Sequence, residues 1–336
     1  KGTVIRENPE RKNLFFFFPQ TGKEVVMIRR ILTFFILLLT LILTSCEHKE
    51  LKFPETVKFR SLRVVLKWEQ LAGFEKPEGM RVIFFPLQGK GDPWIFDFPY
   101  GEDRTIELPA NDYAVASYNY DADGILWKNT DSFWQFTAYT RSVQTPDGEQ
   151  ACITPPWMCG YHLETVSVRD NGKEDELVIT LHPENKVSRY TYEVHGIRHL
   201  ERVADIRASL SGMSGSLLLA NDELPDDVPS ERMLFGGEVK DGQIKGGFYT
   251  FGYRQKSTEP HVFKLYIKSR TGKLHVLEQD VTQQVRSFPV EGPIGNIHLV
   301  LNFDFDIPED SGVSKDDAGF DVGVDDWADV NTDIMC

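Results

Sequence analysis

Short runs of alternating apolar and polar residues recur along the chain after residue 57. In the first of these runs, residues 59–68, Leu62, Val64 and Leu66 fall on one side of an extended backbone and their neighbours on the other. Alternation with a period of two predicts half-buried strands, and β-branched and aromatic residues favour them further. Helical periodicity is nearly absent. We therefore expect an all-β fold.

The predicted strands are separated by turns rich in Gly, Asp, Asn and Pro. They cover residues 59–68, 80–87, 94–98, 104–108, 113–120, 133–141, 161–168, 176–182, 187–195, 204–210, 217–219, 231–239, 243–252, 261–269, 273–281 and 296–305. Residues 145–160 contain several prolines and are interpreted as irregular.

Three turn dipeptides predict hairpins, because Asn-Gly, Asp-Gly and related pairs suit the backbone of tight turns. Asn171-Gly172 predicts that residues 161–168 pair with residues 176–182. Asp241-Gly242 and Thr271-Gly272 predict the same for the strands on either side of them.

The strands divide into two groups, and the second has about seven strands, the number typical of a small β-sandwich. Pro183-Glu184-Asn185 marks the break, so we expect one sandwich over residues 58–185 and a second over residues 186–307. Residues 308–336 are rich in Asp and Gly and poor in large apolar side chains, which predicts a disordered acidic tail.

A different pattern precedes the strands, at residues 27–45. Arg29 and Arg30 are followed by a short apolar run and then by Leu43-Thr44-Ser45-Cys46. A basic start, an apolar centre and small residues at the end predict a bacterial secretory leader. The ending also resembles a lipobox, so Cys46 is the expected lipid attachment site. The alternative, a single membrane helix, requires about 20 apolar residues, more than this run has.

This interpretation assigns the rest of the N-terminal region. Residues 1–26 are expected to be a mis-annotated upstream extension, and residues 46–57 a tether. Residues 1–45 hold seven basic and three acidic residues, so 30 basic and 48 acidic residues remain, a net charge of −18. Binding of phosphate groups requires a basic surface, so nucleic acid is not an expected partner.

No set of residues predicts catalysis, a metal centre or a cofactor. Gly212-Met213-Ser214-Gly215 lacks the last glycine of a nucleophile elbow, and we expect its glycines to allow a turn or bulge. Asn119, Asp121, Asp123 and Gly124 match the first half of a calcium loop, but Thr130 stands where the bidentate Glu belongs. A hairpin turn explains these residues without an ion.

Two cysteines lie within the expected sandwiches, Cys152 and Cys159. In an exported protein they could form a disulfide that braces the Pro-rich loop between them. Two reduced thiols are the other alternative, and the sequence leaves both open.

Three tryptophans lie in the least regular part of the first sandwich: Trp127, Trp134 and Trp157. Aromatic side chains usually pack in cores. If any surface of this sandwich binds a ligand, these three are the candidate residues.

The leader, the two sandwiches and the absence of a catalytic set resemble the fimbrillin-associated lipoproteins of Bacteroidetes and related uncharacterised Bacteroides lipoproteins. The closest local likenesses are residues 208–215, with their Leu-Ser-Gly-Met turn, residues 247–252 and residues 108–113. The likeness covers most of residues 43–306 and does not extend to the acidic tail.

The resemblance implies two transthyretin-like (immunoglobulin-like) β-sandwich domains and a structural or adhesive role, as an anchor or accessory subunit of a fimbrium. It also implies an outer-membrane lipoprotein at the cell surface, attached to the lipid bilayer through acylated Cys46. Its partners would be fimbrial subunits or other surface proteins, bound by strand addition at a sheet edge. The alternative function is a surface glycan-binding lipoprotein that uses the three tryptophans.

Overall fold

The computed structural model describes residues 58–89, 91–169, 177–287 and 296–309, together with Thr33. The predicted all-β class is confirmed: this part of the chain forms five β-sheets, with one short α-helix, α2 (Thr282–Arg286). No helix in it is long and apolar enough to cross a membrane. The predicted leader, Cys46 and the acidic tail after residue 309 lie outside the described residues.

Two sheets enclose the first hydrophobic core. The smaller has the strand order β11 (Leu177–Leu181), β1 (Phe59–Leu66), β4 (Arg104–Pro109). The larger has the order β12 (Glu184–Asn185), β10 (Cys159–Ser167), β5 (Asp112–Asn119), β2 (Gly79–Pro86), β3 (Trp94–Pro99). Leu62 and Val64 from the smaller sheet and Phe84 from the larger are fully buried between them.

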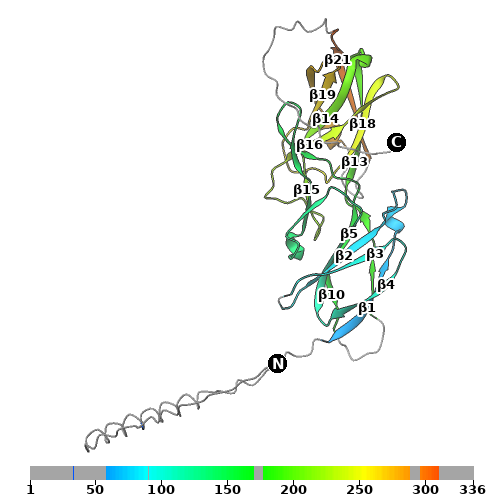
Figure 1. Cartoon of the computed structure of the whole chain (residues 1–336), viewed down its shortest axis with the longest axis vertical. Helices are drawn as coiled ribbons and strands as arrows, with labels where there is room; N and C mark the ends of the chain where they lie inside the picture. Colours follow the sequence, from blue (N-terminus) through cyan, green and yellow to red (C-terminus); the bar gives the residue numbers. More distant parts are fainter. Residues whose placement is uncertain (1–32, 34–57, 90, 170–176, 288–295, 310–336) are drawn as a thin grey trace, which may run out of the picture. The chain divides into compact units, whose positions relative to one another are not determined.

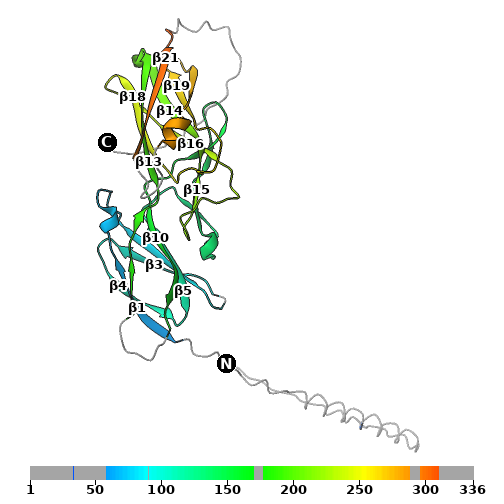
Figure 2. The same ribbon diagram turned by 180° about the vertical axis from the view of Figure 1, so that it is seen from behind.

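Two further sheets enclose a second core (Figures 1 and 2). One has the order β17 (Glu238–Lys240), β18 (Gln243–Thr250), β13 (Ser188–Arg198), β21 (Asn296–Asp306). The other has the order β20 (Leu274–Asp280), β19 (Val262–Ser269), β14 (Val203–Met213), β16 (Glu231–Gly236), β9 (Gln150–Ile153), β8 (Ser142–Gln144). The rings of Tyr192, Phe235 and Phe263 contact one another within it at steep angles, with centroids 5.1–5.8 Å apart.

Strand pairing crosses residue 185 at two places. β9 pairs in parallel with β16, and β8 extends that sheet by one more strand. β7 (Thr137–Tyr139) pairs with β15 (Ser216–Leu218) in a small sheet completed by β6 (Leu126–Lys128). Residues 137–153 therefore hydrogen-bond to strands of the second half of the chain, although they precede residue 185. The described residues also form three 3-10 turns: η1 (Glu69–Leu71), η2 (Phe133–Gln135) and η3 (Leu200–Arg202).

One predicted hairpin is wrong. β10 and β11 do not pair with each other: β10 pairs with β5 and β12, and β11 pairs in parallel with β1. The Asn171-Gly172 turn itself lies outside the described residues. The prediction assumed that neighbouring strands pair, a tendency that sandwiches break whenever the chain moves from one sheet to the other.

Other local predictions are confirmed. Asp241 and Gly242, with φ of 54° and 74°, turn β17 into β18, and Gly272, with φ of 90°, turns β19 into β20. Gly212 has φ of 77°, and the β14–β16 register shifts between Leu210 and Met213, as a bulge requires. Two other predictions are wrong. Residues 133–141 form η2 and β7 rather than one strand, and β9 lies in the segment that was expected to be irregular.

Candidate interaction sites

The strand closest to the predicted tether, β1, is internal to its sheet. Residues 62–66 pair in parallel with β11, and residues 59–64 pair antiparallel with β4. Leu62 and Val64 are fully buried, and Leu66 is 6% exposed. The strand is therefore held by two rows of backbone hydrogen bonds and by its apolar face.

The longest edge strand, β21, is capped by side chains. The amide of Gln284 on α2 pairs with both backbone groups of Val300, since its Nε2 donates to the carbonyl and its Oε1 accepts from the N–H, each at 2.9 Å. The Asn302 N–H donates to Oε1 of Gln279 on β20 at 3.1 Å. An exposed edge strand is a template for pairing with another chain, and these contacts occupy the middle of this one. Sequence reasoning missed these contacts, because nothing in the sequence distinguishes a glutamine that caps a strand from one that faces water.

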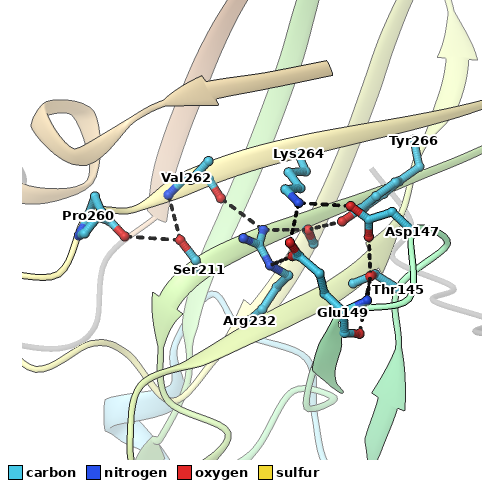
Figure 3. A network of polar contacts seen from close by, with 10 residues as sticks. Thr145, Asp147, Glu149, Ser211, Arg232, Pro260, Val262, Lys264 and Tyr266 are labelled. Atoms are coloured by element: carbon cyan, nitrogen blue, oxygen red, sulfur yellow. Dashed lines mark hydrogen bonds and ion pairs between the residues drawn. The ribbon is translucent and has the colours of Figure 1, made fainter. Parts of the chain in front are cut away.

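A polar network fastens the β8–β9 turn to the outer face of the second sandwich (Figure 3). Lys264 on β19 places its Nζ 2.9 Å from Asp147 and 2.6 Å from Glu149. Arg232 on β16 contacts Glu149 at 3.0 Å and donates to the Ser209 hydroxyl at 3.0 Å. The turn that connects two strands of the first half thus rests on three strands of the second.

The network shifts the pKa values of its charged groups. Burial alone raises the pKa of Asp147, but hydrogen bonds from Thr145 and Lys264 outweigh it and hold that pKa below its ordinary value. Burial alone lowers the pKa of Lys264, and its two carboxylate partners raise it above the ordinary value. Both groups therefore stay charged near neutral pH, which is the state that the contacts require.

Replacing Lys264 by Met should lower the free energy of unfolding by about 1–3 kcal/mol, because two partly buried carboxylates lose their donor. The matched change Lys240→Met removes an exposed lysine from β17 and should cost less than about 0.5 kcal/mol. Urea denaturation measures both changes, and amide hydrogen exchange in residues 142–153 should accelerate only in the Lys264 variant. Equal effects of the two substitutions would contradict this assignment.

His261 lies under the Gly212 bulge and is 1% exposed. Its Nδ1 lies 3.1 Å from the Ser211 carbonyl, so this nitrogen carries the proton. Its Nε2 is buried without a hydrogen-bond partner among the described residues. Burial lowers the pKa of His261, because a second proton would place an unpaired charge in the core.

Stability should therefore fall as the pH drops below about 6.5, the ordinary histidine pKa. The unfolded chain binds a proton there before the folded protein does, so the contribution of neutral His261 is full above this pH and is lost as the pH falls toward the folded-state pKa. The slope is at most about 1.4 kcal/mol per pH unit. In the His261→Phe variant, the free energies of unfolding at pH 7.5 and pH 5.5 should become nearly equal. In the control variant His298→Gln, which removes an exposed histidine, the difference between the two pH values should remain.

The three candidate tryptophans have different environments. Trp134 is 55% exposed. Trp127 is half-buried and stacks on Tyr118 and Phe136, at centroid distances of 3.9 and 5.2 Å. Trp157 is 9% exposed and packs in the first core. A shared aromatic platform would need all three rings at the surface, and of the three only Trp134 is exposed.

Of the two alternatives for the cysteines, the structure has two free thiols. The Cys152 Sγ lies 3.0 Å from Glu231, and the Cys159 Sγ lies 3.7 Å from the Met80 sulfur, in the other core. Burial, followed by the Glu231 carboxylate, raises the pKa of Cys152 to about 12, and burial raises the pKa of Cys159. Both thiols stay protonated and serve as small apolar groups.

The half calcium motif is built into the end of β5. The Asn119 side chain donates to Asp121 at 2.9 Å and accepts the Cys159 N–H at 2.8 Å. Asp121 also accepts the Glu78 N–H at 3.0 Å. These groups join β2, β5 and β10 at one end of the sheet. Among the described residues, no cluster of three or more His, Cys, Asp or Glu side chains could hold a metal ion.

The fold and these contacts define the class: an all-β protein of two packed β-sandwich cores whose polar clusters tie strands and turns together. The chain belongs to the family described as "Domain of unknown function (DUF5119)", whose model matches residues 45–236, more than half of its length.

The name of one sequence relative agrees with the resemblance drawn from the sequence. The chain is 24% identical over 222 residues to a Bacteroides ovatus protein named "Putative fimbrium anchoring subunit Fim4B", and the match covers 66% of this chain and 64% of that one. A crystal structure from Bacteroides ovatus, described as a "putative adhesin", matches with a TM-score of 0.59 at 20% identity and covers 75% of this chain and 94% of its own. The fimbrial anchor protein Mfa2 of Porphyromonas gingivalis gives a TM-score of 0.47 at 14% identity and covers 72% and 91%.

Proposed function

We propose that this chain is a lipid-anchored cell-surface protein with a structural or adhesive role, as an anchor or accessory subunit of a fimbrium. The observation that carries the proposal is the position of β1, which follows the predicted lipid site at Cys46 by a short tether and is paired on both sides. Similarity to a relative named for fimbrium anchoring supports the same role.

Paired in this way, β1 transmits force well. A pull directed along β1 would load the hydrogen bonds to β11 and β4 together, in shear, rather than one after another. It also has to draw Leu62, Val64 and Leu66 out of the first core. An attachment strand of this kind resists extraction more than a strand at the edge of a sheet.

Acylation of Cys46 would supply the membrane attachment, with the sandwiches outside the outer membrane. One acyl chain binds a bilayer only weakly, so stable anchoring needs more than one chain on this residue. We assign the protein no enzymatic activity.

The partner in this proposal is a fimbrial subunit that adds a strand to an open sheet edge. β21 is capped by Gln284 and Gln279, as described above. The longest edge strand that remains is β20, with seven residues, which is last in its sheet order and presents Val276 at 40% exposure. We assign the incoming strand to β20.

The anchoring role is tested in the cells that produce the protein. Replacing Cys46 by Ser should release fimbriae from the cell surface into the medium, whereas Cys336→Ser should leave them attached. The chain should also co-purify with fimbriae. Fimbriae that remain attached to cells carrying the Cys46 variant would overturn the proposal.

The strand edge is tested by photo-crosslinking. A photoreactive phenylalanine at Val276 should crosslink to a fimbrial subunit, while the same residue at Val239 on β17, with 45% exposure, should not. Crosslinking at Val239 alone would move the docking edge to the other sheet.

A further inference from the structure

Four large apolar side chains are exposed at one end of the first sandwich: Phe59 (51%), Leu87 (43%), Trp94 (37%) and Ile95 (56%). We refer to them as the apolar end. The described residues expose eleven large apolar side chains, so over a third of these lie at or next to the ends of β1, β2 and β3. Single exposed apolar residues are ordinary, but a group of them at one site marks a surface that contacts something else.

Strand directions bring these residues together. β2 ends just before Leu87 and β3 begins at Trp94, and these points lie at the same end because the two strands pair antiparallel. β1 begins at Phe59, which reaches the same end through its contact with Trp94. The rings of Phe59 and Trp94 meet edge to face, with centroids 6.1 Å apart and planes at 86°. This contact joins the two sheets at the end of the sandwich.

Neighbouring hydrogen bonds hold the rest of the apolar end in place. The Leu87 N–H donates to the Asp112 carbonyl at 2.8 Å. Asn111 donates from its side chain to the carbonyl of Gln88, also at 2.8 Å. The Asp112 carboxylate is paired with Arg169, which neutralises its charge. The exposed side chains therefore sit on a well-supported surface.

The chain itself indicates what covers this surface. Twelve residues, 47–58, separate Cys46 from Phe59. Fully extended they reach about 40 Å, and a flexible chain of that length spans about 20 Å on average. Once Cys46 is acylated, the apolar end is the part of the sandwich bound to the membrane by the shortest stretch of chain.

We infer that the apolar end rests on the lipid bilayer and inserts Phe59, Leu87, Trp94 and Ile95 among the lipid headgroups. Trp is enriched at the membrane interface, where an amphipathic ring contacts apolar chains and water together. The tether keeps the apolar end at a high local concentration near the bilayer, so that even a weak contact forms. The contact would fix the direction in which the sandwich leaves the membrane. This inference rests on the proposed lipid anchoring at Cys46.

The test places an environment-sensitive fluorophore on the acylated full-length protein, reconstituted in vesicles of phosphatidylethanolamine and phosphatidylglycerol. Ile95→Cys carries the label in a Cys336→Ser background, where Cys152 and Cys159 are buried, and Val239→Cys is the matched control. Brominated lipids should quench the label at Ile95 at least about fivefold more than the label at Val239. Equal quenching of the two labels would overturn the inference. It would also be overturned if the Ile95 label became shielded from water in a way that depends on protein concentration and not on lipid, which would indicate contact with a second copy or a subunit.

A second measurement separates this inference from the proposed function. At a high lipid concentration, which stands in for the tether, part of the unacylated Cys46→Ser protein should float with the same vesicles, and Leu87→Ser/Ile95→Ser should reduce the floated fraction about fivefold without changing the melting temperature. Unchanged flotation of that variant would also overturn the inference. Fimbria release by Cys46→Ser is an independent readout. If release occurs but Ile95 stays unquenched, the anchor stands and the bilayer contact fails.

Discussion

Replacing Gly196 by Ala is expected to lower the free energy of unfolding by about 4 kcal/mol or more. Gly196 lies in β13 with φ of 77°, where the pairing with β21 shifts register between His195 and Ile197. A Cβ at this position would lie 1.7 Å from the Phe303 backbone oxygen. Since a backbone atom cannot move aside as a flexible side chain can, the end of the β13–β21 pairing has to open.

Gly242 supplies the control for this prediction. Its φ of 74° is nearly the same, and a Cβ there would meet nothing within 4 Å. Gly242→Ala should therefore lower the free energy of unfolding by about 1 kcal/mol, which is the effect of the backbone conformation alone. Chemical denaturation of both variants separates the steric part from the conformational part. Similar losses at the two sites would show that the Phe303 contact is not limiting.

Replacing Val64 by Asp is expected to prevent the first sandwich from folding, at a cost above about 4 kcal/mol. Val64 is fully buried in the middle of β1, opposite Arg104 on β4 and Ile179 on β11. A carboxylate there loses its hydration, and the opposite guanidinium of Arg104 is already paired with Glu102 at 3.1 Å. Circular dichroism and protease sensitivity of residues 58–169 measure the loss, and cells should lose attached fimbriae because the attachment strand no longer holds.

Two milder variants keep this prediction decisive. Val64→Ala should fold with a loss of about 2 kcal/mol, because it leaves a cavity without burying a charge. Arg63→Gln changes the neighbouring exposed residue and removes its 3.2 Å ion pair with Asp103. It should cost less than about 1 kcal/mol, since exposed pairs contribute little. A chain that folds normally with Asp at position 64 would contradict the internal position of β1.

Most strands could be predicted from the sequence, because alternation is a local property. Residues 243–250 and 262–269 show it clearly, and the turns at Asp241-Gly242 and Gly272 require backbone conformations that few other residues adopt. The short strands β8 and β9 could not be predicted in this way. Pro146 lies between them, β9 forms because it pairs with the distant β16, and β8 forms because it pairs with β9.

The interaction sites were harder to predict than the strands. Among the tryptophans, the sequence could not distinguish the exposed Trp134 from the buried Trp157, because both lie in irregular segments. The apolar end escaped notice because its members come from three different strands. Each one looks like an ordinary strand residue until the strand ends meet.

Local patterns in the chain are enough to predict the all-β class, the positions of most strands and turns, and the resemblance to fimbrial anchor proteins, since each depends on residues close together in the chain. The choice of partner for each strand is seen only in the folded molecule. There β1 pairs with β11, β9 joins β16, Gln284 caps β21 and Cys152 lies apart from Cys159. The physical reason is that strands carry similar alternation and similar backbone groups. Their partners are selected by the burial of whole faces in two cores, which no local pattern records.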